Sequence, residues 1–94
     1  MKIYIPGDSA AQSVGADLVA VAMAAEAAKR NLEITIVRNG TRGALWLEPL
    51  VEVEIDGKRI GYPNVTSDDV AAVLDGTHNS IGEVDNFEWL KSQD

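Results

Sequence analysis

Cysteine is absent from this sequence of 94 residues. Its absence excludes disulfides, a cysteine-ligated zinc site, a thiol redox motif and a cysteine-ligated iron–sulfur cluster. A chain of this length buries one modest hydrophobic core. We therefore expect residues 1–94 to form a single domain that lacks iron–sulfur ligands.

Basic residues are also scarce, because 8 Lys and Arg stand against 15 Asp and Glu and give a formal net charge of −7. Binding to nucleic acid or to an anionic membrane surface needs clustered positive charge, so this balance argues against both partners. No apolar run approaches the roughly 18 residues of a transmembrane helix. Residues 1–6 are too short and too strand-like for a signal peptide, and a cytoplasmic location is therefore expected.

The first part of the sequence predicts a strand, a helix and a second strand. Lys2–Pro6 alternates in polarity, and Glu33–Val37 is rich in β-branched residues. Between them an Ala-rich helix is expected from about Gly15 to Arg30, ended by Asn31 in a left-handed conformation. The apolar stripe of this helix is predicted from spacings of three and four residues: Leu18, Val21, Ala22, Ala25 and Ala28.

Residues 45–55 alternate with a period of two and predict a third strand. The apolar face is expected to hold Leu47, Pro49, Val51, Val53 and Ile55. Proline at position 49 suggests an edge strand or a bulge. The opposite face is expected to be a solvated row of three carboxylates, Glu48, Glu52 and Glu54.

Asp56–Gly57 is a favoured two-residue hairpin turn, which fixes the register of a fourth strand. The expected pairs are Ile55 with Lys58, Glu54 with Arg59, Val53 with Ile60 and Val51 with Tyr62. A second helix is expected to begin at Thr66–Asp69, to bury Val70, Val73 and Leu74, and to end at Gly76. A short helix near Phe87–Leu90 is predicted in the last segment.

This order of elements predicts an α/β (α+β) domain with a thioredoxin-like fold. Its mixed sheet is expected to hold about four strands, with helices packed on its faces. A ferredoxin-like βαββαβ sandwich is the alternative. That alternative requires a strand after the second helix, and residues 79–94 are not expected to supply one.

Residues that carry reactive chemistry are few. His78, the sole histidine, is interpreted as an exposed loop residue rather than a catalytic base. A row of carboxylates on one strand face is more often solvated than a calcium or magnesium site. Asp68 and Asp69 are explained by helix capping.

The stretch Arg38–Gly43 places two arginines beside two glycines. Such a loop is able to cradle an anion, but it lacks the Lys-Ser/Thr ending of a P-loop, and an ordinary strand connection is the favoured interpretation. Trp46, which follows, is either a core residue or an anchor in a protein–protein interface.

Two strings resemble a known family. Val37–Gly43, followed by Trp46–Val53, is similar to the N-terminal region of the β (diaphorase) subunit of soluble, molybdenum- or tungsten-dependent, NAD-linked formate dehydrogenases. Lys2–Pro6 and Val65–Val70 are also similar, and Phe87–Lys91 matches less closely. The resemblance runs over nearly the whole chain.

The resemblance implies a thioredoxin-like domain at the front of a longer subunit, which is related to the NADH-binding flavoprotein subunit of complex I. FMN, NAD and iron–sulfur clusters are expected in the rest of that subunit. The 94 residues contain no glycine-rich FMN or NAD loop and no Cys ligands. The resemblance therefore assigns no catalytic, cofactor-binding or metal-binding residue to this chain.

A broader similarity is to thioredoxin-like [2Fe-2S] ferredoxins, whose cysteines lie after the first strand and in a loop after the second. Pro6–Ser9 and Asn39–Gly43 occupy the corresponding places here. Because Ser and Asn are poor substitutes for thiolates, the chain resembles a version of that fold without its cluster.

The hypothesis from the sequence is a scaffold or subunit-docking module of an electron-transfer complex. Its partners would be other domains or subunits of a formate dehydrogenase-like complex. The candidate interaction residues are Arg38, Asn39, Arg42, Trp46 and Glu48. Two alternatives stay open: a free-standing protein that assembles or regulates the complex, and a domain that binds an anion or nucleotide at Asn39–Gly43.

Overall fold

The structure, a computed structural model, describes residues 1–7, 15–39 and 47–84. Their elements lie in the order β1 (Lys2–Pro6), α2 (Ala16–Lys29), β2 (Thr35–Asn39), β3 (Val51–Ile55), β4 (Lys58–Tyr62), the 3-10 turn η2 (Ser67–Asp69), α3 (Val70–Asp75) and β5 (Gly82–Glu83). No helix within these three ranges is long and apolar enough to cross a membrane. The predicted helix near Phe87–Leu90 lies outside the described residues.

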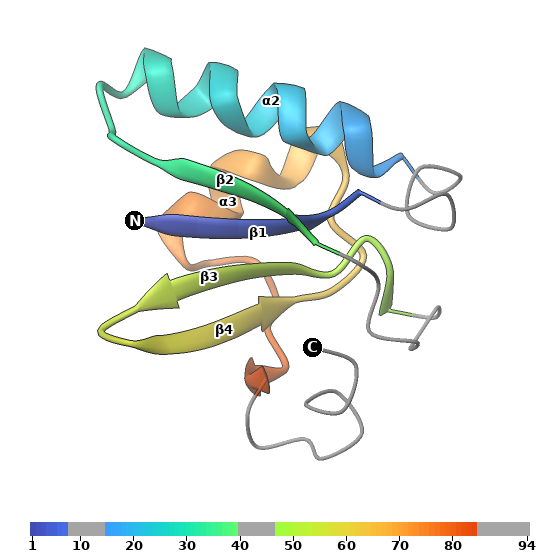
Figure 1. Cartoon of the computed structure of the whole chain (residues 1–94). Helices are drawn as coiled ribbons and strands as arrows, with labels where there is room; N and C mark the ends of the chain where they lie inside the picture. The colour runs from blue at the N-terminus through green and yellow to red at the C-terminus, as the bar shows by residue number, and fades with distance from the viewer. Residues whose placement is uncertain (8–14, 40–46, 85–94) are drawn as a thin grey trace.

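The strands form one mixed sheet in the order β2-β1-β3-β4-β5 (Figure 1). β1 pairs parallel with β2, and the remaining pairs are antiparallel. The predicted mixed α/β sheet is confirmed, with five strands in place of about four. β5 is the strand that the sequence was not expected to supply. The parallel strands β1 and β2 are direct neighbours, so their βαβ unit is not split as in the ferredoxin-like alternative.

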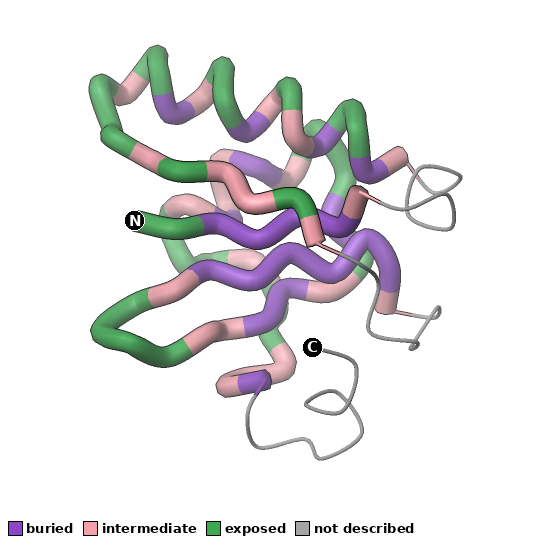
Figure 2. Tube along the Cα trace, in the orientation of Figure 1, coloured by how far each residue is buried: buried purple, intermediate pink, exposed green. Residues whose placement is uncertain are grey.

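Both described helices bury their apolar sides in one core over a single face of the sheet. Ile3 and Ile5 of β1 are completely buried there, together with residues of β3 and α3. The residues of this core are Ile3, Ile5, Ala16, Val19, Met23, Val51, Val53, Tyr62, Val65, Val70 and Val73. In Figure 2 the buried segments of α2 lie on the side of the helix that is turned toward the sheet.

The end of α2 follows the prediction. Asn31 adopts a left-handed conformation with φ of 57°. The amide of Leu32 donates to the carbonyl of Ala27 (2.9 Å), and the amide of Asn31 donates to that of Ala28 (3.1 Å), which is the Schellman arrangement. β2 begins at Thr35 rather than at the predicted Glu33, because Thr35 is the residue that pairs with Lys2 at the start of β1.

The predicted apolar stripe of α2 is wrong in phase. The side chains that face the sheet are Ala16, Val19, Met23 and Ala27, whereas Leu18 and Val21 are 68% and 70% exposed. Apolar residues occur on every side of this Ala-rich helix, so spacing alone does not select one face. The small side chains of Ala16 and Ala27 allow a close approach to the sheet, and Met23 fills the gap between them.

The third strand is shorter than predicted, because Val51–Ile55 alone is paired. Proline at position 49 cannot donate to a strand ladder, and it lies before β3 in a cis peptide bond with Glu48. β3 is an internal strand, and its last residue, Ile55, is 46% exposed beside the hairpin turn. The predicted hairpin register is confirmed at every pair.

The expectation of a solvated carboxylate row is also wrong, since Glu48 and Glu52 are only 6% and 2% exposed. Glu52 lies opposite Gly61 in the ladder. A side chain at Gly61 would place its Cβ 2.9 Å from Val84 and 3.0 Å from Ile81. Glycine thus allows the segment around β5 to cover this part of the sheet, which an alternating pattern does not reveal.

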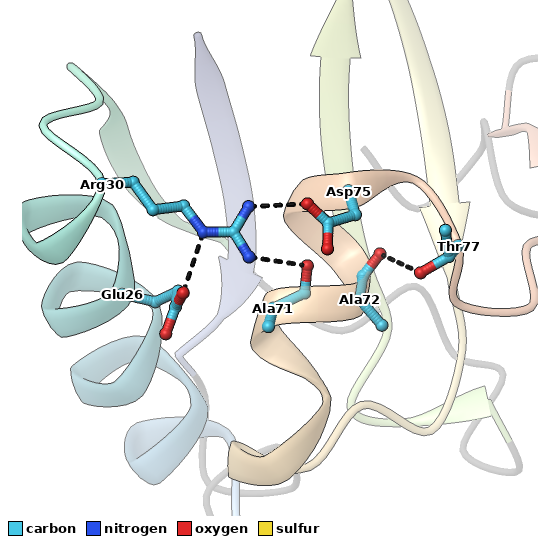
Figure 3. Close-up of polar contacts among 6 residues, drawn as sticks. All are labelled: Glu26, Arg30, Ala71, Ala72, Asp75 and Thr77. Atoms are coloured by element: carbon cyan, nitrogen blue, oxygen red, sulfur yellow. Dashed lines mark hydrogen bonds and ion pairs between the residues drawn. The ribbon is translucent and has the colours of Figure 1, made fainter.

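Arg30 connects the two helices (Figure 3). Its Nε donates to Glu26 (2.8 Å), and its Nη1 donates to Asp75 of α3 (2.7 Å). Nη2 donates to the carbonyl oxygen of Ala71 at 3.4 Å. The bonds to Asp75 and Glu26 raise the pKa of Arg30 above its ordinary value, so the contact stays ionic.

The second helix begins with the predicted cap. The backbone amide and the hydroxyl of Thr66 both donate to one carboxylate oxygen of Asp69, each at 2.9 Å. These bonds hold the pKa of Asp69 below its usual value, because they stabilise the ionised carboxylate. Val70 and Val73 are buried, and Gly76 ends the helix with φ of 73°.

We predict that Asp69→Asn lowers the free energy of unfolding at neutral pH by about 0.5–2 kcal/mol, the usual range for a lost cap. Because the folded pKa of Asp69 is depressed, its contribution is present above the unfolded value near ~4 and disappears as the pH falls through the folded value. Urea unfolding should show the difference in free energy of unfolding between variant and wild type shrinking as the pH falls below the unfolded value.

Asp68→Asn is the matched control, since Asp68 lies in the same first turn. Equal losses in both variants, or a loss at Asp69 that is constant with pH, would contradict the capping assignment.

Candidate functional site

The described candidate residues gather at one end of the sheet. β1 and β2 are parallel, so their carboxyl ends meet where Pro6 pairs with Asn39. β3 is antiparallel to β1, so the segment that enters β3, including Glu48, lies at the same end (Figure 1). The carboxyl end of parallel strands is the usual ligand position in open α/β sheets.

Arg38 ties three elements together at this end. Its Nε donates to the carbonyl of Ile5 (3.1 Å), and its Nη2 donates to that of Pro6 (2.8 Å). The same Nη2 forms an ion pair with Asp17 in the first turn of α2 at 2.7 Å. The guanidinium therefore fastens β2 to β1 and to α2, and its charge is balanced by a carboxylate.

Asn39 closes β2 beside the first residue after β1. Its carbonyl accepts a hydrogen bond from the amide of Gly7 at 2.7 Å. Its side-chain oxygen is buried and accepts no hydrogen bond in the structure as described. Buried polar atoms without a partner are uncommon, so this amide is a candidate for a contact with a bound molecule or a water.

Glu48 lies inside the loop that precedes β3. Its Oε1 accepts a hydrogen bond from the amide of Leu50 at 2.9 Å. Asn64 fastens the same loop, because its backbone amide donates to Leu47 (2.9 Å) and its side-chain amide donates to the carbonyl of Glu48 (3.3 Å). The carboxylate is thus buried where it shapes the loop.

Arg42 and Trp46, the other two candidates, lie outside the described residues. The structure therefore brings Arg38, Asn39 and Glu48 to one end of the sheet, and the interaction role of all five residues stays a prediction.

A cluster on the other face of the sheet was not predicted as a unit. The guanidinium carbon of Arg59 lies 3.8 Å from the centroid of the Tyr4 ring, and Arg59 contacts Glu52 at 3.5 Å. The hydroxyl of Tyr4 donates to Glu54 at 3.0 Å. The predicted hairpin register already placed Glu54 opposite Arg59, and this pairing was the part of the cluster that the sequence could reveal. Tyr4 was missed because it comes from a distant strand.

His78 is half-buried rather than exposed as expected. Its Nε2 donates to the carbonyl of Pro63 at 2.9 Å, and its ring is tilted against Tyr62 with the centroids 6.3 Å apart. These contacts give it a packing role. Within residues 1–7, 15–39 and 47–84, no group of three or more His, Asp or Glu side chains is placed to hold a metal ion.

We predict that Arg38→Met destabilises the fold by about 1–2 kcal/mol, because it removes the charged donor but keeps most of the apolar stem. The control is Lys58→Met, which breaks an exposed ion pair with Glu83 and should cost less than about 0.5 kcal/mol. Urea unfolding gives the free energy of unfolding of both variants. Equal midpoints for the two variants would show that the Arg38 contacts do not hold the strand ends together.

Comparison with known proteins supports the fold and no closer relationship. No protein-family model matches the chain. No curated protein matches it either. Among solved structures, the chain is similar to a thioredoxin-like [2Fe-2S] ferredoxin from Aquifex aeolicus, with a TM-score of 0.65 and 20% identity over 87% of this chain and 90% of the ferredoxin chain.

A [2Fe-2S] cluster of this kind requires thiolate ligands. This sequence contains no cysteine, and the described residues at the carboxyl ends of β1 and β2 include Arg38 and Asn39, which carry no thiolate. These residues do not fit an iron–sulfur cluster. The chain therefore has the thioredoxin-like fold without the ligands that a ferredoxin cluster needs.

Proposed function

We propose that this chain is a cofactor-free, thioredoxin-like domain of an NAD-linked electron-transfer complex, in which it docks other domains or subunits. The proposal is supported by the structural similarity to a thioredoxin-like [2Fe-2S] ferredoxin, taken together with a sequence that has no cysteine. A domain of this fold without thiols cannot carry electrons by thiol or iron–sulfur chemistry. Its remaining contribution to such a complex is a surface.

The finer assignment, to the N-terminal region of a formate dehydrogenase β subunit, rests on the resemblance at Val37–Gly43 and Trp46–Val53. In this proposal FMN, NAD and iron–sulfur clusters belong to other parts of the complex.

The contacts of Arg38 favour docking over anion binding. A site for a free anion or nucleotide needs cationic groups that are not already neutralised. Nη2 of Arg38 is instead bound to Pro6 and to the carboxylate of Asp17. An incoming phosphate would have to compete with a carboxylate that is already in place at 2.7 Å.

Five residues are proposed to serve docking, and Arg38, Asn39 and Glu48 among them lie at one end of the sheet. Arg42 and Trp46 are the proposed anchors, because Arg and Trp are enriched among residues that dominate binding energies. Asn39 offers an amide to a partner. Arg38 and Glu48 are proposed to act by fixing the strand end and the loop on either side.

The test is affinity purification of the tagged chain from its own host, followed by measurement of formate-dependent NAD reduction in the eluate. We expect this activity to accompany the wild-type chain. The double variant Arg42→Ala, Trp46→Ala should recover at least about tenfold less, which corresponds to about 1.4 kcal/mol of lost binding energy.

The matched control is a double alanine variant at the tip of the hairpin, Ile55→Ala with Lys58→Ala, since both residues are exposed and distant from the candidate end. It should recover as much activity as the wild type. No formate-linked activity with the wild-type chain would overturn the assignment to this complex. Equal recovery with both double variants would overturn the proposed docking residues.

A further inference from the structure

The outer side of α2 is apolar although it is exposed. Its exposed apolar residues are Leu18, Val21, Ala24, Ala25 and Ala28, and its exposed charges are Asp17 and Lys29. Leu18 and Val21 are the two most exposed of the large hydrophobic side chains recorded in the described residues, at 68% and 70%. Figure 2 shows this exposed side of α2 pointing away from the sheet.

The apolar positions repeat as a helix seam does. Leu18, Val21, Ala25 and Ala28 are separated by three, four and three residues. This is the spacing with which one helix packs along another, and it was misassigned to the core from the sequence. Leu32, just beyond the end of α2, is 40% exposed.

We propose that this seam is the contact surface for a second copy of the chain, with the two α2 helices packed antiparallel about a twofold axis. Centred at the level of Met23, such a pair sets Leu18 against the partner's Ala28 and Val21 against the partner's Ala25. Each layer then joins a large side chain to a small one, so the seam is complementary to itself. A twofold pair requires this self-complementarity.

The charges on this side of α2 permit a second copy to approach. The chain carries a net charge of −7, but the exposed side of α2 carries one acid and one base. The acid, Asp17, is neutralised by Arg38. Antiparallel packing also places the end that bears Asp17 at the level of the partner's Lys29 and opposes the two helix dipoles.

The size of the surface sets the expected affinity. A helix of 14 residues is about 21 Å long and about 10 Å wide, so α2 alone covers much less than the ~800 Å² per partner of a standard interface. An open groove of about 650 Å³ between α2 and β2 extends the surface and is lined partly by Ala24, Ala28 and Leu32. We therefore expect a weak dimer, with a Kd of roughly micromolar or weaker.

The first test is sedimentation of the purified chain over a range of concentrations that spans this Kd. The wild type should pass from monomer to dimer. Val21→Glu should remain monomeric, because it places a carboxylate against the partner's Ala25 in an apolar layer. The matched control is Ile55→Glu, which makes the same change at an exposed position of β3 and should dimerise as the wild type does.

The second test fixes the orientation, and it uses the absence of native cysteine. Leu18→Cys mixed with Ala28→Cys should form a crosslinked heterodimer on oxidation. Leu18→Cys alone should not crosslink, because the two sites would lie about 15 Å apart along an antiparallel pair. In a parallel pair, Leu18→Cys alone would crosslink, and the mixture of Leu18→Cys with Ala28→Cys would give no crosslinked heterodimer.

A wild-type chain that stays monomeric at every concentration would overturn the proposal. Dimerisation that Val21→Glu leaves unchanged would overturn it as well, because the contact would then lie elsewhere. Both outcomes are independent of the proposed docking function, because none of the proposed docking residues belongs to α2.

Discussion

Strand β1 is hydrogen-bonded along both edges, parallel to β2 and antiparallel to β3, and the rest of the domain is arranged around this double pairing. Ile3 and Ile5 are fully buried, so the strand can neither slip by one residue nor turn over without exposing them. The parallel pairing places the ends of β1 and β2 together, and the antiparallel pairing brings the entry to β3 to the same place. The candidate site is a consequence of this register.

Side-chain contacts hold that end of the sheet. Arg38 joins β2 to β1 and α2 through carbonyls and a carboxylate, and Glu48 fastens the loop before β3. Farther away, Arg30 joins α2 to α3. The described charged groups at this end of the sheet thus connect elements of the fold to one another.

The sequence predicted the features that depend on local chemistry. The Asp56–Gly57 turn set the hairpin register, Asn31 and Gly76 ended the helices, and the order of elements predicted the thioredoxin-like fold. The prediction from sequence failed where the result depends on contacts with a segment that is distant in the chain. The phase of α2 depends on the sheet beneath it, and the burial of Glu52 depends on Ile81 and Val84 lying over Gly61. Arg38 was recognised as a candidate, but its carbonyl partners come from another strand.

The apolar core around β1 holds the domain together, so its stability should not depend on a bound iron–sulfur cluster. Native-state amide hydrogen exchange of the purified chain in the presence of a chelator measures this dependence. We expect the amides of residues 3–5 to exchange only by global unfolding, and we expect added iron and sulfide to leave their protection unchanged. Amides in β1 that exchange freely under chelation, and that gain protection when iron and sulfide are supplied, would contradict this expectation.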